Sequence, residues 1–386
     1  MSSWPQFDVD QINAVVKTLE EGKVNAWTGK DVANFERKFA QRFQTKHAIA
    51  LANGSVTLNL ALECLKLKPG DEVIVSPRSF VASASCVLLY GATPIFADVD
   101  RDSQNITDDT IARLITSKTK GIIPVHLAGW PCDMPKIMDL ANANKLWVIE
   151  DCAQAHGARI NGTPVGNFGD FGSYSFCQDK IMTTGGEGGM LTTENTELWA
   201  NAWSYKDHGK NYDTVFNKSH PTGFRWLHEG LGTNLRMPGI SAAIGAVQVD
   251  KLDKWLIARQ QNAEILTQAT AQIPLLRTPV PEAGLQHAWY RFYTFIRPEM
   301  LAANWSRDRI IQEISNCGFP AFSGSCSEIY LEKVFVERGI GPSKRLPIAR
   351  ELGETSLAFL VDPTITHDQT LALANCITDI CKKASK

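Results

Sequence analysis

The sequence lacks any long apolar run. No stretch of about 18 uninterrupted apolar residues occurs among its 386, which argues against a membrane-spanning helix. Its first residues have no basic segment followed by an apolar one, so we expect no signal peptide. An excess of one charge is also absent, because 39 basic side chains balance 41 acidic ones and leave a net charge of -2. We therefore expect no nucleic acid or anionic membrane as partner, and any phosphate-bearing ligand must bind at a local site.

Cysteine pairs with metal-binding or redox spacing are missing too. The chain has nine cysteines, an odd number, and none forms a Cys-x-x-Cys pair. Scattered thiols in a chain of this length indicate reduced, mostly buried side chains in a cytoplasmic protein. We expect neither a disulfide framework nor a metal site.

What the sequence does contain is an alternation of two patterns. Between about residues 47 and 193, short runs rich in Val, Ile and aromatic residues alternate with segments of helical periodicity, such as residues 55–65. This alternation predicts an α/β protein with a mostly parallel sheet covered by helices on both faces. Ligands of such sheets bind beyond the carboxyl ends of the strands.

The pattern changes in the second half of the chain. A long helical stretch covers about residues 241–271, a strand-like run covers 289–296, and a further helix covers 368–383. We therefore predict a large domain over residues 1–250 and a smaller C-terminal α/β domain over 251–386, connected by the long helix.

The first segment suited to chemistry is Asn53-Gly54-Ser55-Val56, where a strand ends and a helix is expected to begin. Asn53-Gly54 turns the chain, and Ser55 stands where an N-cap is expected. Free N–H groups and the positive end of the helix dipole suit a phosphate. An ordinary strand-turn-helix junction would have the same sequence.

The second and third segments supply an acid and an amine. Asp151 ends a strongly apolar strand, where a carboxylate is costly unless it meets a cation or a metal. Lys180 follows the strand-like residues 172–176 and precedes a glycine cluster. Apolar neighbours would lower the pKa of this lysine and make its amine a nucleophile toward carbonyls, although most lysines are surface residues. An anion site, a strand-end carboxylate and a carbonyl-reactive lysine together match the needs of pyridoxal 5′-phosphate.

The order of motifs resembles the DegT-type nucleotide-sugar aminotransferases, which are fold-type I pyridoxal-phosphate enzymes. The resemblance implies a large domain with a seven-stranded, mostly parallel sheet. The matching stretches are Trp27-Thr28-Gly29, Asn53-Gly54-Ser55, Pro77-Arg78-Ser79-Phe80, His126-Leu127-Ala128-Gly129, Glu150-Asp151 through Ala158, Ser175-Phe176 through Lys180, Gly186-Glu187-Gly188-Gly189 and Gly232-Thr233-Asn234 through Met237.

This resemblance assigns expected roles to particular residues. Lys180 would bind the cofactor covalently and later move the proton, while Asp151 would pair with the pyridinium nitrogen. The cofactor would also contact Gly54, Ser55, Val56 and Ser175 through its phosphate, Gln154 near its ring oxygen and Phe80 on its ring face. Asn234 would reach the phosphate bound by a second subunit, so we expect a homodimer with a shared active site.

The expected reaction is transfer of an amino group from L-glutamate to a keto carbon of a nucleotide-linked deoxysugar. The resemblance favours C4 of a UDP-linked 2-acetamido-2,6-dideoxy-4-keto-hexose, on a route to an O-antigen type of surface polysaccharide. A 3-keto sugar, or a dTDP- or GDP-linked sugar, is the close alternative. The expected substrate contacts are Trp27, Thr28, His208 and Arg236. The long, polar, Gly-rich loop over residues 206–232 is either a functional segment or a plain surface excursion.

Two departures from the family pattern bear on the sugar. Gly29 is followed by Lys30 where relatives usually have proline, and residues 358–363 differ from the usual Leu-Pro-Leu strand. Residues 323–330 also lack the histidine-bearing loop of many relatives. The first two departures lie nearer the expected substrate mouth than the cofactor.

Three other functions would require different residues. A pyridoxamine-dependent sugar dehydratase would have histidine in place of Lys180, and a non-catalytic regulatory relative would be expected to lose Lys180 or Asp151. A dinucleotide-binding oxidoreductase would need Gly-x-Gly-x-x-Gly after its first strand, which this sequence lacks.

Overall fold

The computed structural model describes residues 2–386, which form three β-sheets. The largest has seven strands in the order β1-β9-β8-β5-β4-β2-β3, and only β9 runs antiparallel to its neighbours. The strands are β1 His47–Leu51, β2 Glu72–Val75, β3 Thr93–Phe96, β4 Thr119–Ile123, β5 Trp147–Asp151, β8 Phe171–Ser175 and β9 Gly189–Thr193. The predicted mostly parallel, seven-stranded sheet is confirmed.

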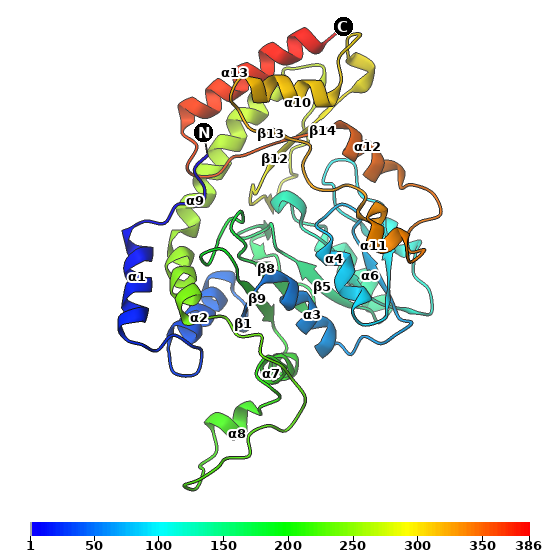
Figure 1. Ribbon diagram of the computed structural model, residues 1–386. Coiled ribbons are helices and arrows are strands. Elements are labelled where there is room, and N and C mark those ends of the chain that lie inside the picture. Colours follow the sequence, from blue (N-terminus) through cyan, green and yellow to red (C-terminus); the bar gives the residue numbers. More distant parts are fainter. Residues whose placement is uncertain (1) are drawn as a thin grey trace.

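Helices cover both faces of this sheet because its side chains alternate between two apolar clusters. Ala48 and Ala50 of β1 belong to one cluster, and Ile49 and Leu51 belong to the other. The first cluster includes α2 Asp31–Phe43, α5 Asp108–Ala112, α6 Met134–Ala143 and α9 Gly239–Ala271. The second includes α3 Gly54–Cys64, α4 Ala82–Leu88 and α7 Thr196–Tyr205 (Figure 1).

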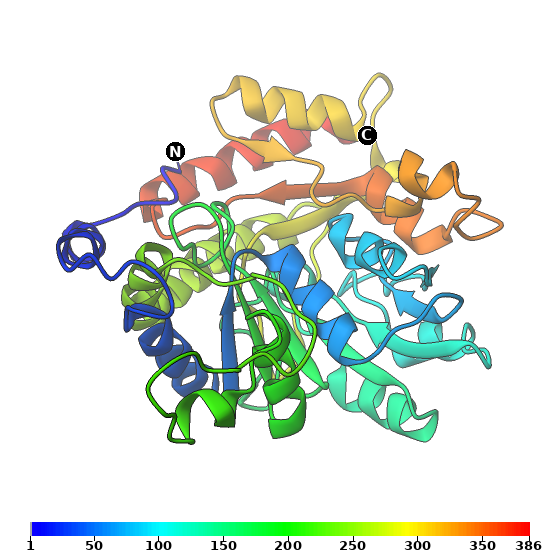
Figure 2. The same cartoon turned by 60° about the horizontal axis from the view of Figure 1, so that its bottom comes forward.

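Helix α9 runs from the large sheet to a smaller one. Its Ala242 and Leu252 pack in the first cluster, whereas Ala263 and Leu266 pack in a third cluster around the C-terminal sheet. That sheet is antiparallel and lies beside two helices (Figures 1 and 2). Its strands in spatial order are β10 Leu276–Arg277, β12 Phe292–Ile296, β14 Ser356–Phe359 and β13 Ala321–Phe322, and the helices are α10 Arg307–Asn316 and α13 His367–Ala384.

The remaining elements are short or peripheral. A small three-stranded sheet joins β11 Leu285–Gln286, β6 Arg159–Ile160 and β7 Thr163–Pro164. The other helices are α1 Val9–Glu20, α8 Tyr212–Phe216, α11 Lys333–Val336 and α12 Pro347–Thr355, with 3-10 turns Leu127–Gly129, Pro298–Met300 and Ile329–Leu331. None of the helices formed by residues 2–386 combines the length and apolar character that crossing a membrane requires.

Two expected elements differ from the structure. The strand expected over 289–296 begins only at Phe292. The segment expected as a loop over 206–232 contains helix α8, which begins after Asn211 because the Asn211 side chain accepts a hydrogen bond of 2.9 Å from the Thr214 N–H. This cap, and not an apolar periodicity, starts the helix.

Candidate active site

Lys180 lies in a cavity of about 720 Å³. It belongs to the connection between β8 and β9, which starts at the carboxyl end of β8. The wall of the cavity includes residues from both the large sheet's connections and the C-terminal part of the chain: Ser79, Phe80, Val81, Gln154, Asp179, Lys180, Tyr290, Arg291, Tyr293, Phe322, Gly324, Ser325, Cys326, Ile329, Glu332, Lys333, Val334 and Ala358. A cavity therefore lies at the strand ends, where a ligand site was expected.

A hydrogen-bonded chain holds the Lys180 amine. Lys180 Nζ donates to Tyr290 Oη at 3.3 Å and lies 3.5 Å from Asp179 Oδ1. The Tyr290 hydroxyl in turn donates to Asp179 Oδ2. Burial alone would raise the pKa of Asp179, but Lys180, the Tyr290 hydroxyl and Arg291 together hold it below its usual range. Asp179 is therefore an anion beside a cationic lysine at neutral pH.

The charge of Lys180 corrects the sequence-based expectation. Burial was expected to lower its pKa, and burial does act in that direction. The neighbouring Tyr290 and Asp179 outweigh this effect, so the pKa of Lys180 lies above its ordinary value. The sequence could not reveal this balance, because Tyr290 is 110 residues away from Lys180 along the chain.

Asp151 ends strand β5 and is almost fully buried. Its carboxylate accepts hydrogen bonds from Ser83 Oγ at 2.7 Å and from the Ala153 N–H at 3.1 Å. Within residues 2–386, no basic side chain lies within 4.0 Å of this carboxylate. Burial consequently raises the pKa of Asp151, with the Ser83 hydroxyl and the Ala153 N–H acting in the opposite direction. A cationic ring nitrogen would supply the charge that this carboxylate lacks.

The helix start at the end of β1 differs from the expected arrangement. Asn53, and not Ser55, is the N-cap of α3, and its side-chain oxygen accepts from the N–H groups of Ser55 and Val56, each at 3.0 Å. Gly54 is the first helical residue and touches the end of β8. A Cβ atom added there would lie only 2.6 Å from the Cβ of Ser175. The four expected phosphate contacts thus meet at one place, but two of their N–H groups already have an acceptor.

Gln154 and Phe80 also reach the Lys180 cavity. The side-chain oxygen of Gln154 accepts a 2.8 Å hydrogen bond from the Ala128 N–H, so its amide plane is fixed while its NH₂ group donates to no residue in the described part of the chain. Phe80 is 68% exposed, which is unusual for a phenylalanine. A ring-shaped ligand in the cavity would cover this apolar surface.

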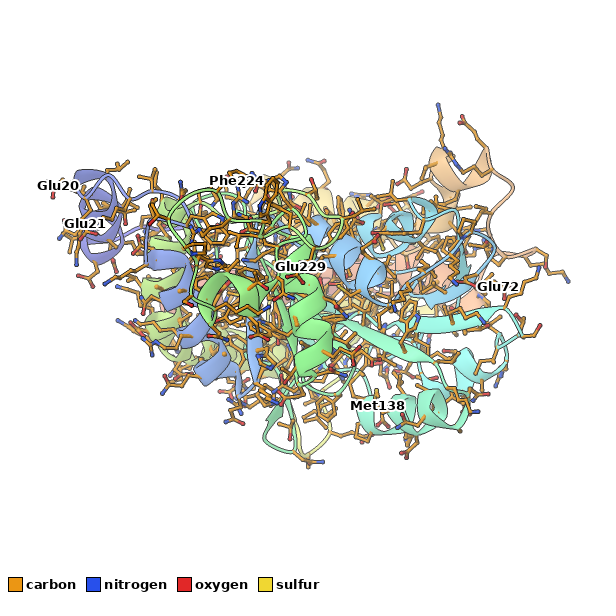
Figure 3. The ribbon with its side chains drawn as sticks, turned by 90° about the horizontal axis from the view of Figure 1, so that it is seen from below. Glu20, Glu21, Glu72, Met138, Phe224 and Glu229 are labelled. Atoms are coloured by element: carbon orange, nitrogen blue, oxygen red, sulfur yellow. The ribbon has the colours of Figure 1, made fainter. Side chains whose placement is uncertain are left out.

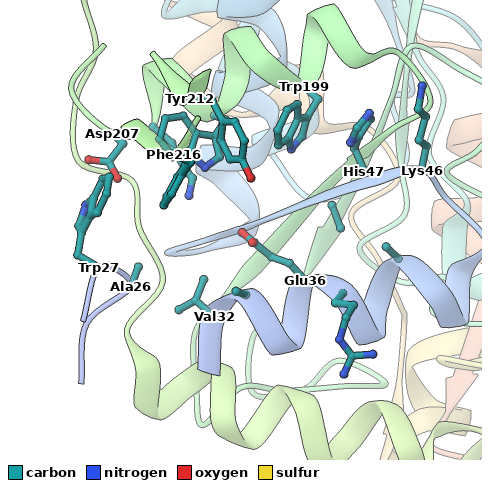
Figure 4. A pocket seen from close by; sticks show the side chains of 16 residues that line it. Ala26, Trp27, Val32, Glu36, Lys46, His47, Trp199, Asp207, Tyr212 and Phe216 are labelled. Carbon is teal, nitrogen blue, oxygen red and sulfur yellow. The ribbon is translucent and has the colours of Figure 1, made fainter. Parts of the chain in front are cut away.

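The expected substrate residues lie elsewhere. Trp27 lines a second cavity of about 400 Å³, where it stacks on Phe216 (Figure 4). The amine of Lys210 lies 3.8 Å from the centroid of the Trp27 ring. Arg236 pairs with Asp207 at 2.7 Å on the same side of the molecule. Thr28 and His208 are exposed, and none of these four expected substrate residues lines the Lys180 cavity of the same chain.

The segment that carries Asn234 and Arg236 nevertheless approaches the helix start. Leu51 and Arg236 form an isolated antiparallel bridge, and the Ala52 N–H donates to the Leu235 carbonyl at 3.0 Å. These contacts lie just before Asn53. Asn234 itself is exposed and contributes nothing to the Lys180 cavity of its own chain.

Behind the site lies a buried polar cluster of Glu150, His126 and Cys152. Its geometry is that of a structural network. Glu150 accepts from the N–H groups of Gly166, Phe168 and Gly169 at 2.7–2.9 Å, and its contact with His126 Nε2 is 3.1 Å. With four partners, the two carboxylate oxygens have little capacity left for a metal ion.

Several site residues are not among those expected from the sequence. Tyr290, Asp179 and Arg291 line the cavity together with Lys180, and Ser83 holds Asp151. Asp179 lies inside the quoted stretch from Ser175 to Lys180, and Ser83 stands three residues after Phe80, so their place in these motifs is the signal that could have found them. Tyr290 and Arg291 come from the C-terminal part of the chain, and only folding brings them to the carboxyl edge of the large sheet.

The fit of pyridoxal phosphate to this edge follows from four observations. Asp151 is a buried carboxylate with no ion-pair partner among residues 2–386, and Lys180 lines a cavity. Gly54 allows close packing at a helix start, and the exposed Phe80 borders the same cavity. The cofactor requires binding contacts of these kinds. The sheet order and this site together define a fold-type I pyridoxal-phosphate enzyme.

The chain belongs to the DegT/DnrJ/EryC1/StrS aminotransferase family, whose sequence pattern matches residues 5–378. It is therefore an aminotransferase, and pyridoxal 5′-phosphate is its cofactor. The fold closely matches the X-ray structure of an aminotransferase from Psychrobacter cryohalolentis, which is 48% identical and superimposes with a TM-score of 0.98 over 99% of both chains.

Two relatives with named activities are also similar. The GDP-perosamine synthase of Caulobacter vibrioides is 35% identical over 81% of both chains. The UDP-N-acetyl-3-dehydro-alpha-D-glucosamine 3-aminotransferase of Acidithiobacillus ferrooxidans is 34% identical over 86% of this chain and 83% of its own.

Proposed function

We propose that this aminotransferase moves the amino group of L-glutamate to C4 of UDP-2-acetamido-2,6-dideoxy-4-keto-hexose, for O-antigen type polysaccharide biosynthesis. The names of two similar enzymes support a nucleotide-linked sugar, because one makes GDP-perosamine and the other aminates a UDP-linked 3-keto sugar. The same names keep a GDP-linked acceptor and C3 amination as alternatives. The observation that carries the proposal is the cavity at the carboxyl edge of the sheet, which Lys180 lines.

In this proposal, Lys180 holds the cofactor covalently and moves a proton to and from the reacting carbon. Asp151 pairs with the pyridinium nitrogen, Gln154 donates to the ring oxygen, and Phe80 covers one ring face. When bound, the cofactor supplies a protonated ring that accepts electron density from the substrate carbon. The residues that bind its phosphate are Gly54, Ser55, Val56 and Ser175, with Asn234 contributed by the second subunit.

The buried state of Asp151 supports its proposed part. Desolvation makes an isolated carboxylate unfavourable there, so a cationic partner gains more interaction energy at this position than it would in water. The pairing would keep the ring nitrogen protonated. Ser83 keeps the carboxylate oriented through its 2.7 Å hydrogen bond.

The substrate test is a panel of nucleotide-linked keto sugars. The purified enzyme is incubated with L-glutamate and each of the UDP-, dTDP- and GDP-linked 3-keto and 4-keto sugars, and the amino sugar is measured by mass spectrometry. We expect the highest kcat/KM with the UDP-linked 4-keto sugar. A higher kcat/KM with any other member of the panel would refute this choice of acceptor.

A homodimer with a shared active site is part of the same proposal. The connection around α8 projects away from the sheets (Figure 1). Its Trp226 and Leu231 are 85% and 92% exposed. Phe224, labelled in Figure 3, belongs to the same exposed group. Apolar side chains this exposed are typical of a surface that another chain covers. The expected substrate residues, which lie apart from the Lys180 of their own chain, would then serve the partner's site.

Mixing two inactive variants tests the shared site. Lys180→Ala and Asn234→Ala chains are each expected to be weakly active as pure dimers. After unfolding and refolding together, they should regain about a quarter of the wild-type activity, because about half of the dimers are hybrids with one intact site. If the mixture is no more active than the separate variants, Asn234 acts on its own chain's site or on none.

The charge of Asp179 should control how fast the cofactor attaches. Because the pKa of Lys180 lies above its ordinary value, the reactive neutral amine is scarce at neutral pH and increases as the pH rises from about 7 to 9. Asp179→Asn removes a contribution that raises this pKa. We therefore expect several-fold faster attachment of pyridoxal phosphate to cofactor-free protein at neutral pH, followed by absorbance. Asp179→Glu, which keeps the charge, is the matched control, and equal rates in both variants would contradict the prediction.

Two further parts of the proposal concern organisation and compartment. We propose that residues 1–250 and 251–386 are the two domains, with α9 crossing between their apolar clusters. We also propose a cytoplasmic location. All nine cysteines are free thiols, which supports a reducing compartment.

A further inference from the structure

Arg291 is a cation that lines the Lys180 cavity and has only one weak ion-pair partner in the part of the chain that the structure describes. Its side chain is 25% exposed, and its guanidinium lies beside the rings of Tyr290 and Phe322, 4.9 Å and 5.7 Å from their centroids. It donates no hydrogen bond to any of residues 2–386. Its one ion pair within that range is a long contact of 4.0 Å to Asp179 Oδ2.

Asp179 is a weak partner for Arg291, because both of its carboxylate oxygens already contact other groups. The same Oδ2 atom already accepts from the Tyr290 hydroxyl, and Oδ1 lies 3.5 Å from Lys180 Nζ. The arginine fork therefore keeps its donors available, while the two aromatic rings restrict its movement. A guanidinium held in this way suits a carboxylate, which it can bind through two parallel hydrogen bonds.

The position of Arg291 relative to Lys180 suggests which carboxylate it binds. Lys180 Nζ lies 4.8 Å from the centroid of the Tyr290 ring, and the Arg291 guanidinium lies 4.9 Å from the same centroid. The reacting amine of an amino acid must come close to Lys180. Its α-carboxylate is attached to the same carbon atom as the amine. Arg291 lines the same cavity as Lys180 and contacts the same Asp179 carboxylate, so it is close enough to Lys180 to bind that group.

We propose that Arg291 binds the α-carboxylate of the amino donor and thereby orients the carbon from which Lys180 removes a proton. The inference rests on the proposed function, in which an amino acid is the donor. Arg291 is a residue for donor recognition and makes no proposed contact with the nucleotide-linked sugar. Its effect should consequently appear in one half-reaction only.

The test separates the two half-reactions in the holoenzyme. Arg291→Gln, Arg291→Lys and the control Lys333→Gln, which removes another cation from the same cavity, are each titrated with L-glutamate while the cofactor absorbance is followed. We expect the donor concentration for half-conversion to rise about 100-fold in Arg291→Gln, and less in Arg291→Lys, which keeps the charge but loses the fork. Lys333→Gln and the KM for the keto sugar should remain close to wild type.

A binding measurement provides a readout independent of turnover. Glutarate has carboxylates but no amine to react, so its affinity for the holoenzyme can be measured by calorimetry. We expect it to bind to wild type and to Lys333→Gln, and to bind at least about tenfold more weakly to Arg291→Gln. Circular dichroism checks that the variants are folded. If Arg291→Gln does not fold, Arg291→Lys provides the test.

Defined outcomes overturn the inference. Unchanged donor affinity in Arg291→Gln refutes it, and so does an equal loss for donor and keto sugar, which would indicate a structural effect. A loss confined to the keto sugar would assign Arg291 to the acceptor. Failure of the proposed function looks different: if wild type aminates no keto sugar or prefers another amino acid to L-glutamate, the donor titration still measures the α-carboxylate contact, which all amino acids share.

Discussion

Replacing Lys180 by alanine is expected to lower kcat by at least about 10⁴-fold, because the same amine is proposed both to hold the cofactor and to transfer the proton. Its side chain lines the 720 Å³ cavity, and within residues 2–386 its amine forms a hydrogen bond with Tyr290 and an ion pair with Asp179 alone, so its removal should leave the fold intact. Activity is measured with L-glutamate and the keto sugar that reacts best with wild type.

Lys333→Ala is the matched control, because Lys333 lines the same cavity but is exposed and forms no ion pair within residues 2–386. Its kcat should stay within about threefold of wild type. Borohydride reduction followed by peptide mapping should find the cofactor mass on the Lys180 peptide. An unmodified peptide, or full activity of Lys180→Ala, would refute the part proposed for this residue.

The largest effect on stability is expected from Glu150. This carboxylate is fully buried and accepts four hydrogen bonds, three of them from the backbone of Gly166, Phe168 and Gly169. In Glu150→Gln, an NH₂ group would replace one carboxylate oxygen, so N–H donors would face another donor where they now have an acceptor. We expect the free energy of unfolding to fall by about 3 kcal/mol, because buried donors lose a charged partner and find no substitute.

Urea denaturation with linear extrapolation measures this change. Glu282→Gln is the control, since Glu282 is exposed and has no ion pair in the described part of the chain, and it should change stability by less than about 0.5 kcal/mol. If the two variants are equally stable, the Glu150 network does not hold the loop over residues 166–169 to the end of β5.

The sequence predicted the large sheet well because its signals are local and repeated. Apolar alternation along β1 and helical periodicity in α3 depend on neighbours a few residues apart, and both appear in the structure as two apolar clusters on opposite faces. The prediction was less accurate where a single side chain decides at which residue a helix begins. Asn53 caps α3 although Ser55 was expected to, and Asn211 starts a helix in an expected loop, because a single hydrogen bond leaves no periodic pattern.

The charge state of the site depended on residues both next to Lys180 and far from it along the chain. Burial of Lys180 could be expected from its apolar neighbours, yet the direction of its pKa change came from Asp179 together with Tyr290. Likewise, the burial that raises the pKa of Asp151 is a property of the packed strand ends. Electrostatic effects of this kind require the three-dimensional distances between charges.

The amino-acid sequence by itself determined the alternating α/β architecture and the chain positions of Asn53, Asp151 and Lys180 at strand ends, because strand and helix patterns are encoded in short stretches of neighbouring residues. Only the tertiary structure decided which side chains surround Lys180. Tyr290 and Arg291 reach it after the C-terminal sheet has packed along α9, and hydrogen bonds across such chain distances depend on packing and not on local propensity.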